Sequence, residues 1–134
     1  KGNIRGDIYG SPDGLWFDQR GILWTQTDIS SGALGKGAYS RITNNMMFAA
    51  DPVSKEFRRF LIGPNGCEVT GVDLTPDYKT MFVNIQHPGE SPSERRSNPD
   101  KPKAFSDWPD RKLFSRPRSA TIAIWREDGK PVGS

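Results

Sequence analysis

Apolar residues fall in short blocks separated by turn residues, which predicts β-strands. The apolar cluster 15–17 follows the turn sequence 11–14, and the block 22–27 follows the turn 18–21. Short apolar blocks on both sides of a turn are typical of a β-hairpin. A second hairpin is predicted from the blocks 46–50 and 57–61, joined by the turn 51–55.

The same order of blocks recurs further along the chain. Placing Gly14 on Gly71, 57 residues later, also places Leu15 on Val72 and, with one added turn residue, Gln26 on Asn84. The period exceeds the 40 to 50 residues usual for propeller blades because each unit carries an insertion. We therefore predict an all-β fold with two four-stranded antiparallel blades of a β-propeller. The strands at Gly14 and Gly71 are expected to be innermost, and those at Phe57 and Val132 outermost.

The predicted blade-like units span residues 11–62 and 67–134 and contain long inserted loops at 29–44 and 91–118. The first insertion is rich in glycine, as expected for a loop or lid. The second holds five of the 11 prolines and eight basic against four acidic residues. It is either a solvated surface loop or a basic loop that faces a substrate.

Composition narrows the class of protein. With 14 Gly and 11 Pro in 134 residues, the chain is interrupted too often for a helical bundle. No apolar run approaches the roughly 18 residues of a membrane span, so no membrane partner is expected. A net charge of +3 is too small to indicate nucleic acid as a partner.

The chain holds one cysteine, Cys67, which excludes an internal disulfide and a multi-cysteine zinc site. A lone cysteine is more often a small buried apolar residue than a ligand. No signal peptide begins at Lys1, although a mature chain or a fragment would have lost one. Nucleophile-elbow, Walker and dinucleotide-binding motifs are absent from the sequence.

Candidate metal ligands lie where the predicted inner strands begin. Because inner strands line the channel of a propeller, polar residues at their mouths converge on one axis. Asp13 and Glu68 hold these positions, and carboxylate oxygens suit hard cations such as calcium. Asp13 is also a favoured turn residue in Ser-Pro-Asp-Gly. Asp28 and His87 end the second strand of their units, where each either contacts a ligand or only terminates the strand.

Three segments carry a resemblance to a known family: Pro-Asp-Gly-Leu-Trp-Phe-Asp at 12–18, Gly-Cys-Glu-Val-Thr-Gly at 66–71, and the run from Phe82 to Glu90. Together with Arg116 and Arg118 before the last strand, they resemble the C-terminal part of the PhoX-type alkaline phosphatases. The resemblance covers nearly the whole chain. It implies a large β-propeller that hydrolyses phosphomonoesters with calcium and iron and is exported to the bacterial periplasm or beyond.

The same resemblance sets limits on function. The earlier blades, which in the family supply the iron-ligating cysteine, further glutamates and a phosphate-binding arginine, have no counterpart here. Cys67 falls in a different motif from that cysteine. The resemblance supports Asp13 and Glu68 as acidic inner-strand positions, with His87, Asp28, Arg116 and Arg118 as weaker candidates. We therefore expect a fragment that is inactive alone and that self-associates through its exposed blade edges.

Two other classes of function remain open at this stage. Pro-Asp-Gly-Leu around Asp13, together with Asp28, also resembles strand ends of six-bladed metal hydrolases of the lactonase type. A non-catalytic propeller module that binds a partner is the other alternative.

Overall fold

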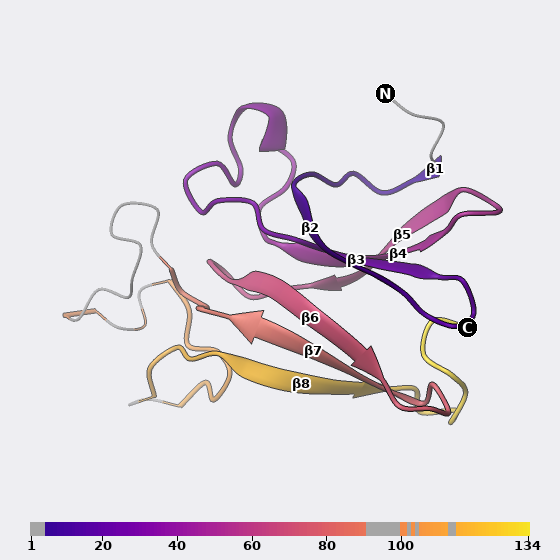
Figure 1. The fold of residues 1–134 in the computed structure, drawn as a ribbon. Helices are drawn as coiled ribbons and strands as arrows, with labels where there is room; N and C mark the ends of the chain where they lie inside the picture. Colours follow the sequence, from indigo (N-terminus) through magenta and orange to yellow (C-terminus); the bar gives the residue numbers. More distant parts are fainter. Residues whose placement is uncertain (1–4, 91–99, 102, 104, 113–114) are drawn as a thin grey trace.

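Two stacked β-sheets make up the computed structural model, which describes residues 5–90, 100–101, 103, 105–112 and 115–134 (Figure 1). The first sheet has the strand order β1-β5-β4-β3-β2, and the second has the order β6-β7-β8. Within the described residues, no helix is long and apolar enough to cross a membrane. The elements are β1 (Arg5–Gly6), β2 (Pro12–Phe17), β3 (Leu23–Thr27), the 3-10 helix η1 (Gly37–Tyr39), β4 (Met46–Asp51), β5 (Glu56–Ile62), β6 (Glu68–Leu74), β7 (Thr80–Gln86) and β8 (Ala120–Trp125).

The main core lies between the two sheets, where β6 packs against β2, β3 and β4. Side chains alternate along β7, so that Met81, Val83 and Ile85 are buried while Phe82 and Asn84 are exposed. Burial of a large apolar side chain stabilises a fold by about 1.5 to 3 kcal/mol. The buried members of this core are Trp24, Met47, Cys67, Val69, Met81, Val83, Ile85 and Val132.

A second core covers the opposite face of the first sheet. Phe48 and Phe57 stack there at 4.8 Å between ring centroids, and Tyr9 meets Phe57 at 4.4 Å. Ile29 and Ile42, at the two ends of the 29–44 insertion, are buried in the same cluster. This insertion therefore packs against the sheet that it leaves.

The predicted repeat is confirmed in the registers of the two inner hairpins. In both, the inner strand bulges at its glycine, between Pro12 and Leu15 in β2 and between Thr70 and Val72 in β6. An amide from the neighbouring strand takes the place of the missing side chain. A Cβ on Gly14 would lie 2.0 Å from Oε1 of Gln26, and a Cβ on Gly71 would lie 2.7 Å from Nδ2 of Asn84.

The outer strands differ from the prediction. Val132 lies in a turn rather than in a strand, so the described part of the second sheet has three strands instead of four. Pro131 lacks an N–H, and Gly133 packs against the Trp24 ring, so the chain folds back over Trp24 instead of extending. In the first sheet, the two-residue strand β1 pairs in parallel outside β5, which is therefore not outermost.

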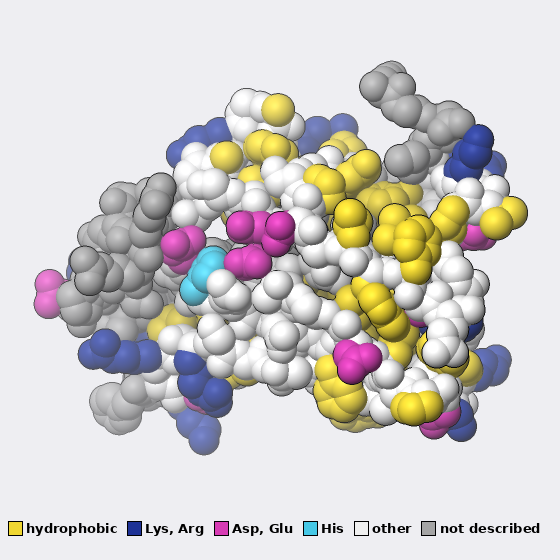
Figure 2. Space-filling model, in the orientation of Figure 1, with side chains coloured by type: hydrophobic (Ala, Val, Ile, Leu, Met, Phe, Trp, Pro, Cys, Tyr) yellow, Lys and Arg dark blue, Asp and Glu magenta, His cyan; other side chains and the backbone are white. Residues whose placement is uncertain are grey.

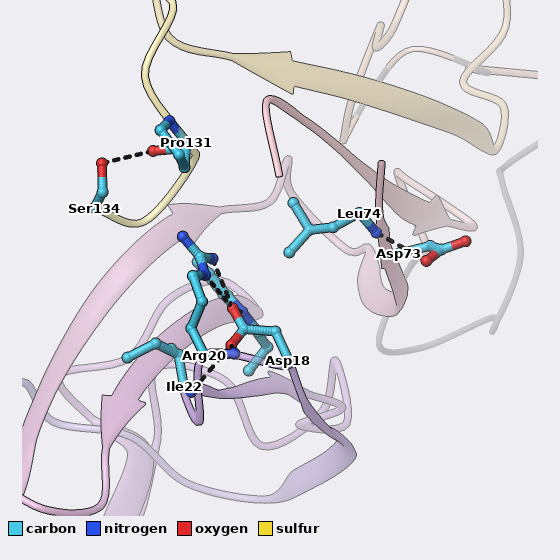
Figure 3. Close-up of polar contacts among 8 residues, drawn as sticks. Asp18, Arg20, Ile22, Asp73, Leu74, Pro131 and Ser134 are labelled. Atoms are coloured by element: carbon cyan, nitrogen blue, oxygen red, sulfur yellow. Dashed lines mark hydrogen bonds and ion pairs between the residues drawn. The ribbon is translucent and has the colours of Figure 1, made fainter. Parts of the chain in front are cut away.

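The turn between β2 and β3 ties the first sheet to the C-terminal segment. The buried Asp18 carboxylate accepts hydrogen bonds from Arg20 and from the Ile22 N–H (Figure 3). It also accepts one from Nε1 of Trp24. The Arg20 guanidinium lies 4.6 Å from the ring centroid of Tyr78, whose carbonyl accepts from the Val132 N–H. These contacts hold the two sheets together at one end of the stack.

Candidate functional site

Glu68 and His87 lie side by side. Glu68 opens β6 opposite Gln86, the last residue of β7, and His87 follows directly. Oε2 of Glu68 lies 3.5 Å from Nε2 of His87. The Glu68 side chain is 14% exposed and that of His87 39% exposed. Two residues singled out separately in the sequence therefore form one cluster.

A second carboxylate, which the sequence analysis missed, lies on the other side of the ring. Oε2 of Glu90 is 3.7 Å from Nδ1 of His87, and this nitrogen is also 3.2 Å from the carbonyl oxygen of Gly66. Figure 2 shows acidic side chains (magenta) gathered around the single histidine (cyan). The sequence His-Pro-Gly-Glu puts a carboxylate three residues after the histidine, and this spacing was the signal from which the contact could have been predicted.

Backbone contacts fix the turn that carries His87 and Glu90. The Gly89 N–H donates to the Asn65 carbonyl at 2.7 Å, and the His87 N–H donates to Oγ of Ser119 at 2.9 Å. Gly66 adopts a φ of +65°, and a Cβ there would lie 2.5 Å from the Glu90 carbonyl oxygen. The turn therefore packs tightly against the loop that precedes Glu68.

A hollow of about 280 Å³ adjoins this cluster. Glu90 and Gly66 reach it from the second unit, and residues of the 29–44 insertion close its other side. It has the size of a small-ligand subsite and a mixed polar and apolar lining. The lining residues are Ser31, Leu34, Thr43, Asn65, Gly66, Glu90 and Phe105.

Asp13 and Asp28 lie at strand ends in the first sheet, but Asp13 is not at the position equivalent to Glu68. Asp13 directly precedes the bulge at Gly14 in β2, whereas Glu68 lies three residues before the corresponding bulge in β6. Asp28 directly follows β3, as His87 follows β7. Both aspartates are exposed, and the described contacts do not join either of them to Glu68. Among the residues that the structure describes, no three His, Cys, Asp or Glu side chains converge as a metal site.

Arg118 is held by an ion pair with Asp110. Its Nε and Nη2 donate to the two carboxylate oxygens of Asp110 at 3.1 and 2.9 Å. The hydrogen bonds from Arg118, together with its charge, hold the pKa of Asp110 below its usual value. Arg116 is exposed to solvent. Of the two arginines, Arg116 is the one without a described ion pair.

Cys67 belongs to the core, as predicted for a lone cysteine. Its side chain is 1% exposed, and burial raises the pKa of the thiol to about 12. Because the thiolate is the form that binds metals, this environment does not suit a ligand.

Comparisons with known proteins identify the relatives of this chain. The model of the family described as alkaline phosphatase PhoX matches residues 1–89. The chain belongs to the PhoX family. A comparison with curated proteins found no match.

A solved structure extends the similarity to PhoX beyond residue 89. It is described as Pseudomonas fluorescens PhoX in complex with vanadate, a transition state analogue. The identity is 46% with a TM-score of 0.76, over 91% of this chain and 19% of that PhoX chain. The present chain thus spans about a fifth of the length of this relative. The PhoX match and the two sheets confirm an all-β propeller fragment.

Proposed function

We propose that this chain is the C-terminal part of a metal-dependent phosphomonoesterase and does not hydrolyse phosphomonoesters alone. The observation that carries the proposal is the 46% identity to a PhoX whose structure holds a transition state analogue. Units 11–62 and 67–134 are then consecutive blades of one propeller. The substrate is a phosphomonoester, and the family resemblance supports a location of the whole protein in the bacterial periplasm or outside the cell.

The carboxylates of the chain fit calcium better than its thiol fits iron. Asp13 and Glu68 are hard oxygen donors at the starts of the two inner strands, and calcium takes 6 to 8 oxygen ligands. Cys67 offers no thiolate, because its buried thiol has a pKa of about 12. We therefore assign Asp13 and Glu68 to calcium and leave iron, which the resemblance also implies, to residues outside this chain.

A divalent cation held at this chain would supply the charge that polarises a phosphoryl oxygen and neutralises the charge developing during transfer. Asp13 and Glu68 would each offer carboxylate oxygens to such a cation from the starts of the two inner strands. Arg116 is free to approach the phosphate as a cation, whereas Arg118 would first have to leave Asp110. We assign to Asp28 and His87 the lesser role of orienting a bound group.

The proposed inactivity of the chain alone follows from the number of ligands. Two carboxylates leave most of a calcium coordination sphere to be filled by other blades or water. Preorganised charge is what stabilises a phosphoryl transition state, and a partial ring does not supply it.

The test is an assay of the full-length protein and of the 134-residue chain with p-nitrophenyl phosphate and a lactone, with calcium and with chelator. We expect phosphate release by the full-length protein that chelator abolishes, and no turnover by the chain. Lactone opening would favour a lactonase-type hydrolase, and no reaction in any mixture would favour a binding module. Turnover by the chain alone would show that the other blades are dispensable.

A further inference from the structure

The outer side of β8 has no partner strand among the described residues. The second sheet has the order β6-β7-β8, and Figure 1 shows β8 as its last strand. In the described part of the chain, the backbone hydrogen bonds made by loops and turns do not reach residues 120–125. We propose that an extended segment of the full-length protein, from outside these 134 residues, adds to β8 as a fourth strand.

The repeat within the chain places a fourth strand at this edge. The strands β2, β3 and β4 pair in the same antiparallel order as β6, β7 and β8. In the first sheet, β5 then pairs with β4 along its whole length, from Met46 to Asp51. Residues 126–134 do not take this place in the second sheet, because they turn back and the Val132 N–H donates to the Tyr78 carbonyl at 2.8 Å.

The core is only partly covered along β8. Ile122 lies opposite Val83 and Ile124 opposite Met81, so these side chains share the face that packs against the first sheet. Val83 and Met81 are fully buried, whereas Ile122 and Ile124 are half-buried. A strand with apolar side chains beside the two isoleucines would complete their burial. The expected occupant is therefore an extended segment with apolar residues at alternate positions.

The sequence of β8 is suited to strand addition. Exposed sheet edges in soluble proteins usually carry charged side chains, proline or a bulge, which prevent pairing with another strand. β2 begins with Pro12 and is bulged before Leu15, and β5 carries Arg58 and Arg59. β8 reads Ala-Thr-Ile-Ala-Ile-Trp, without charge or proline, and its register with β7 is regular. Such an edge is typical of a strand that is paired on both sides.

The rest of the longer protein is the source that fits this edge. The chain covers 19% of the PhoX chain to which it is similar, so most of that relative lies outside it. The first sheet shows that a distant segment adds to an edge in this fold, since Arg5 and Gly6 pair with Glu56 and Phe57 in parallel. The proposal rests on the proposed function only in treating the chain as one part of a longer protein.

Hydrogen–deuterium exchange of the full-length protein and of the 134-residue chain tests the pairing. Residues of an edge strand alternate between facing their neighbour and facing away, so about half of the β8 amides are open in the chain. We expect the exchange rate of β8 relative to β7 to be about 10-fold lower in the full-length protein, because the added hydrogen bonds must open first. An equal ratio in the two proteins would overturn the proposal. Protection of β8 that rises with the concentration of the chain to the full-length value would assign the edge to a second copy instead, which also overturns it.

Cross-linking identifies the segment. Ala123→Cys puts a thiol on an exposed position of β8, and Val53→Cys, in the exposed turn between β4 and β5, is the matched control. Cys67 is 1% exposed, and the unchanged protein gives its background. With a short thiol-to-amine reagent, we expect Ala123→Cys to join one segment outside residues 1–134 of the same molecule, and Val53→Cys not to join that segment. Links from position 123 only to residues 1–134, or only to another copy, would overturn the proposal. Neither measurement uses phosphatase activity, so this failure is distinct from failure of the proposed function.

Discussion

Nδ2 of Asn45 donates a hydrogen bond of 2.9 Å to the carbonyl oxygen of Cys67, joining the residue before β4 to the residue before β6. Asn45 is 2% exposed, and its other bonds are also made inside the protein. Oδ1 accepts from the Thr27 hydroxyl and the Ile29 N–H, while Nδ2 also donates to the Ile29 carbonyl. One amide therefore sets where the second sheet starts, directly before Glu68.

Replacing Asn45 with alanine is expected to cost about 3 kcal/mol of unfolding free energy, because several buried polar groups lose their partners at once. Urea unfolding measures the loss. Asn44→Ala is the matched control, since this neighbour is only half-buried and bonds to the Gly63 carbonyl and to the exposed Asn65 side chain, where water has access. Equal losses in the two variants would contradict the role of Asn45.

Asp18 is expected to make the fold sensitive to acid. Burial alone would raise the pKa of Asp18, but hydrogen bonds from Trp24, Arg20 and Ile22 outweigh it and lower the pKa below 3.8. A carboxyl whose pKa falls on folding adds stability that is fully present above its unfolded pKa and is lost as the pH falls through the folded value.

Thermal unfolding between pH 7 and pH 2 tests this dependence. Asp18→Asn should be less stable at pH 7, because its amide N–H groups meet the donors of Arg20 and Trp24. The deficit should shrink as the pH falls from about 3.8, where the unfolded carboxyl takes up its proton, to below the lowered pKa of the folded carboxyl, where the native carboxyl is protonated as well. A deficit that is constant with pH would rule out the charge of Asp18 as its cause.

Gly66→Ala should disturb the cluster around His87. Gly66 and Gly35 both have positive φ angles, of +65° and +71°, but nothing lies within 4 Å of a Cβ on Gly35. Gly35→Ala is expected to cost about 1 kcal/mol for the backbone conformation alone. Gly66→Ala should cost about 2 kcal/mol more, because the added methyl group meets the Glu90 backbone. Chemical denaturation of both variants measures the difference, and similar losses would show that the turn gives way easily.

Asp13→Ala in the full-length protein should abolish calcium-dependent phosphatase activity, because it removes one oxygen ligand. The unfolding midpoint should not change, because Asp13 is exposed and its substitution removes no core contact. Asp73→Ala is the control, since Asp73 is exposed on β6 away from the start of the strand. Activity and metal content are measured together. Unchanged values for Asp13→Ala would exclude it as a ligand.

The isolated chain is expected to self-associate, because Leu15 and Phe17 on the first sheet are 64% and 58% exposed and Trp125 on the second is 67% exposed. Sedimentation at several concentrations should show a mass that rises with concentration. Leu15→Lys or Trp125→Lys should lower it, whereas Val53→Lys, in the turn between β4 and β5, should not. A monomer at all concentrations would refute the expectation.

Local sequence was sufficient for the hairpins and for part of the site. Turn residues marked the connection between β6 and β7, and counting back from the pair Leu74 and Met81 would place Glu68 opposite His87. The bulge at Gly71 shifts the partner to Gln86, so the two side chains meet diagonally. Their proximity was therefore open to prediction from the hairpin alone.

The remaining features depend on contacts between segments far apart in the chain. Asn45 looked like an ordinary loop residue, and its bond to Cys67 exists only because the two sheets stack. The fold-back of Val132 over Trp24 likewise depends on a ring in the first sheet. The spacing of three residues was enough to predict that Glu90 lies near His87, but only the packed turn brings Glu90 to the hollow.

The stacking of the two sheets leaves the molecule with two different outer faces. The face that carries Trp24 in the first sheet is covered by the face that carries Val72 and Leu74 in the second. The opposite face of the first sheet is covered in part by the second core but leaves Leu15 exposed, whereas the opposite face of the second sheet exposes Phe82, so the two outer faces are unlike each other. Copies that join through unlike faces form head-to-tail contacts, which a twofold axis cannot close. Assembly would then continue until the rotation per copy completes a ring, and a rotation that never closes would give a filament.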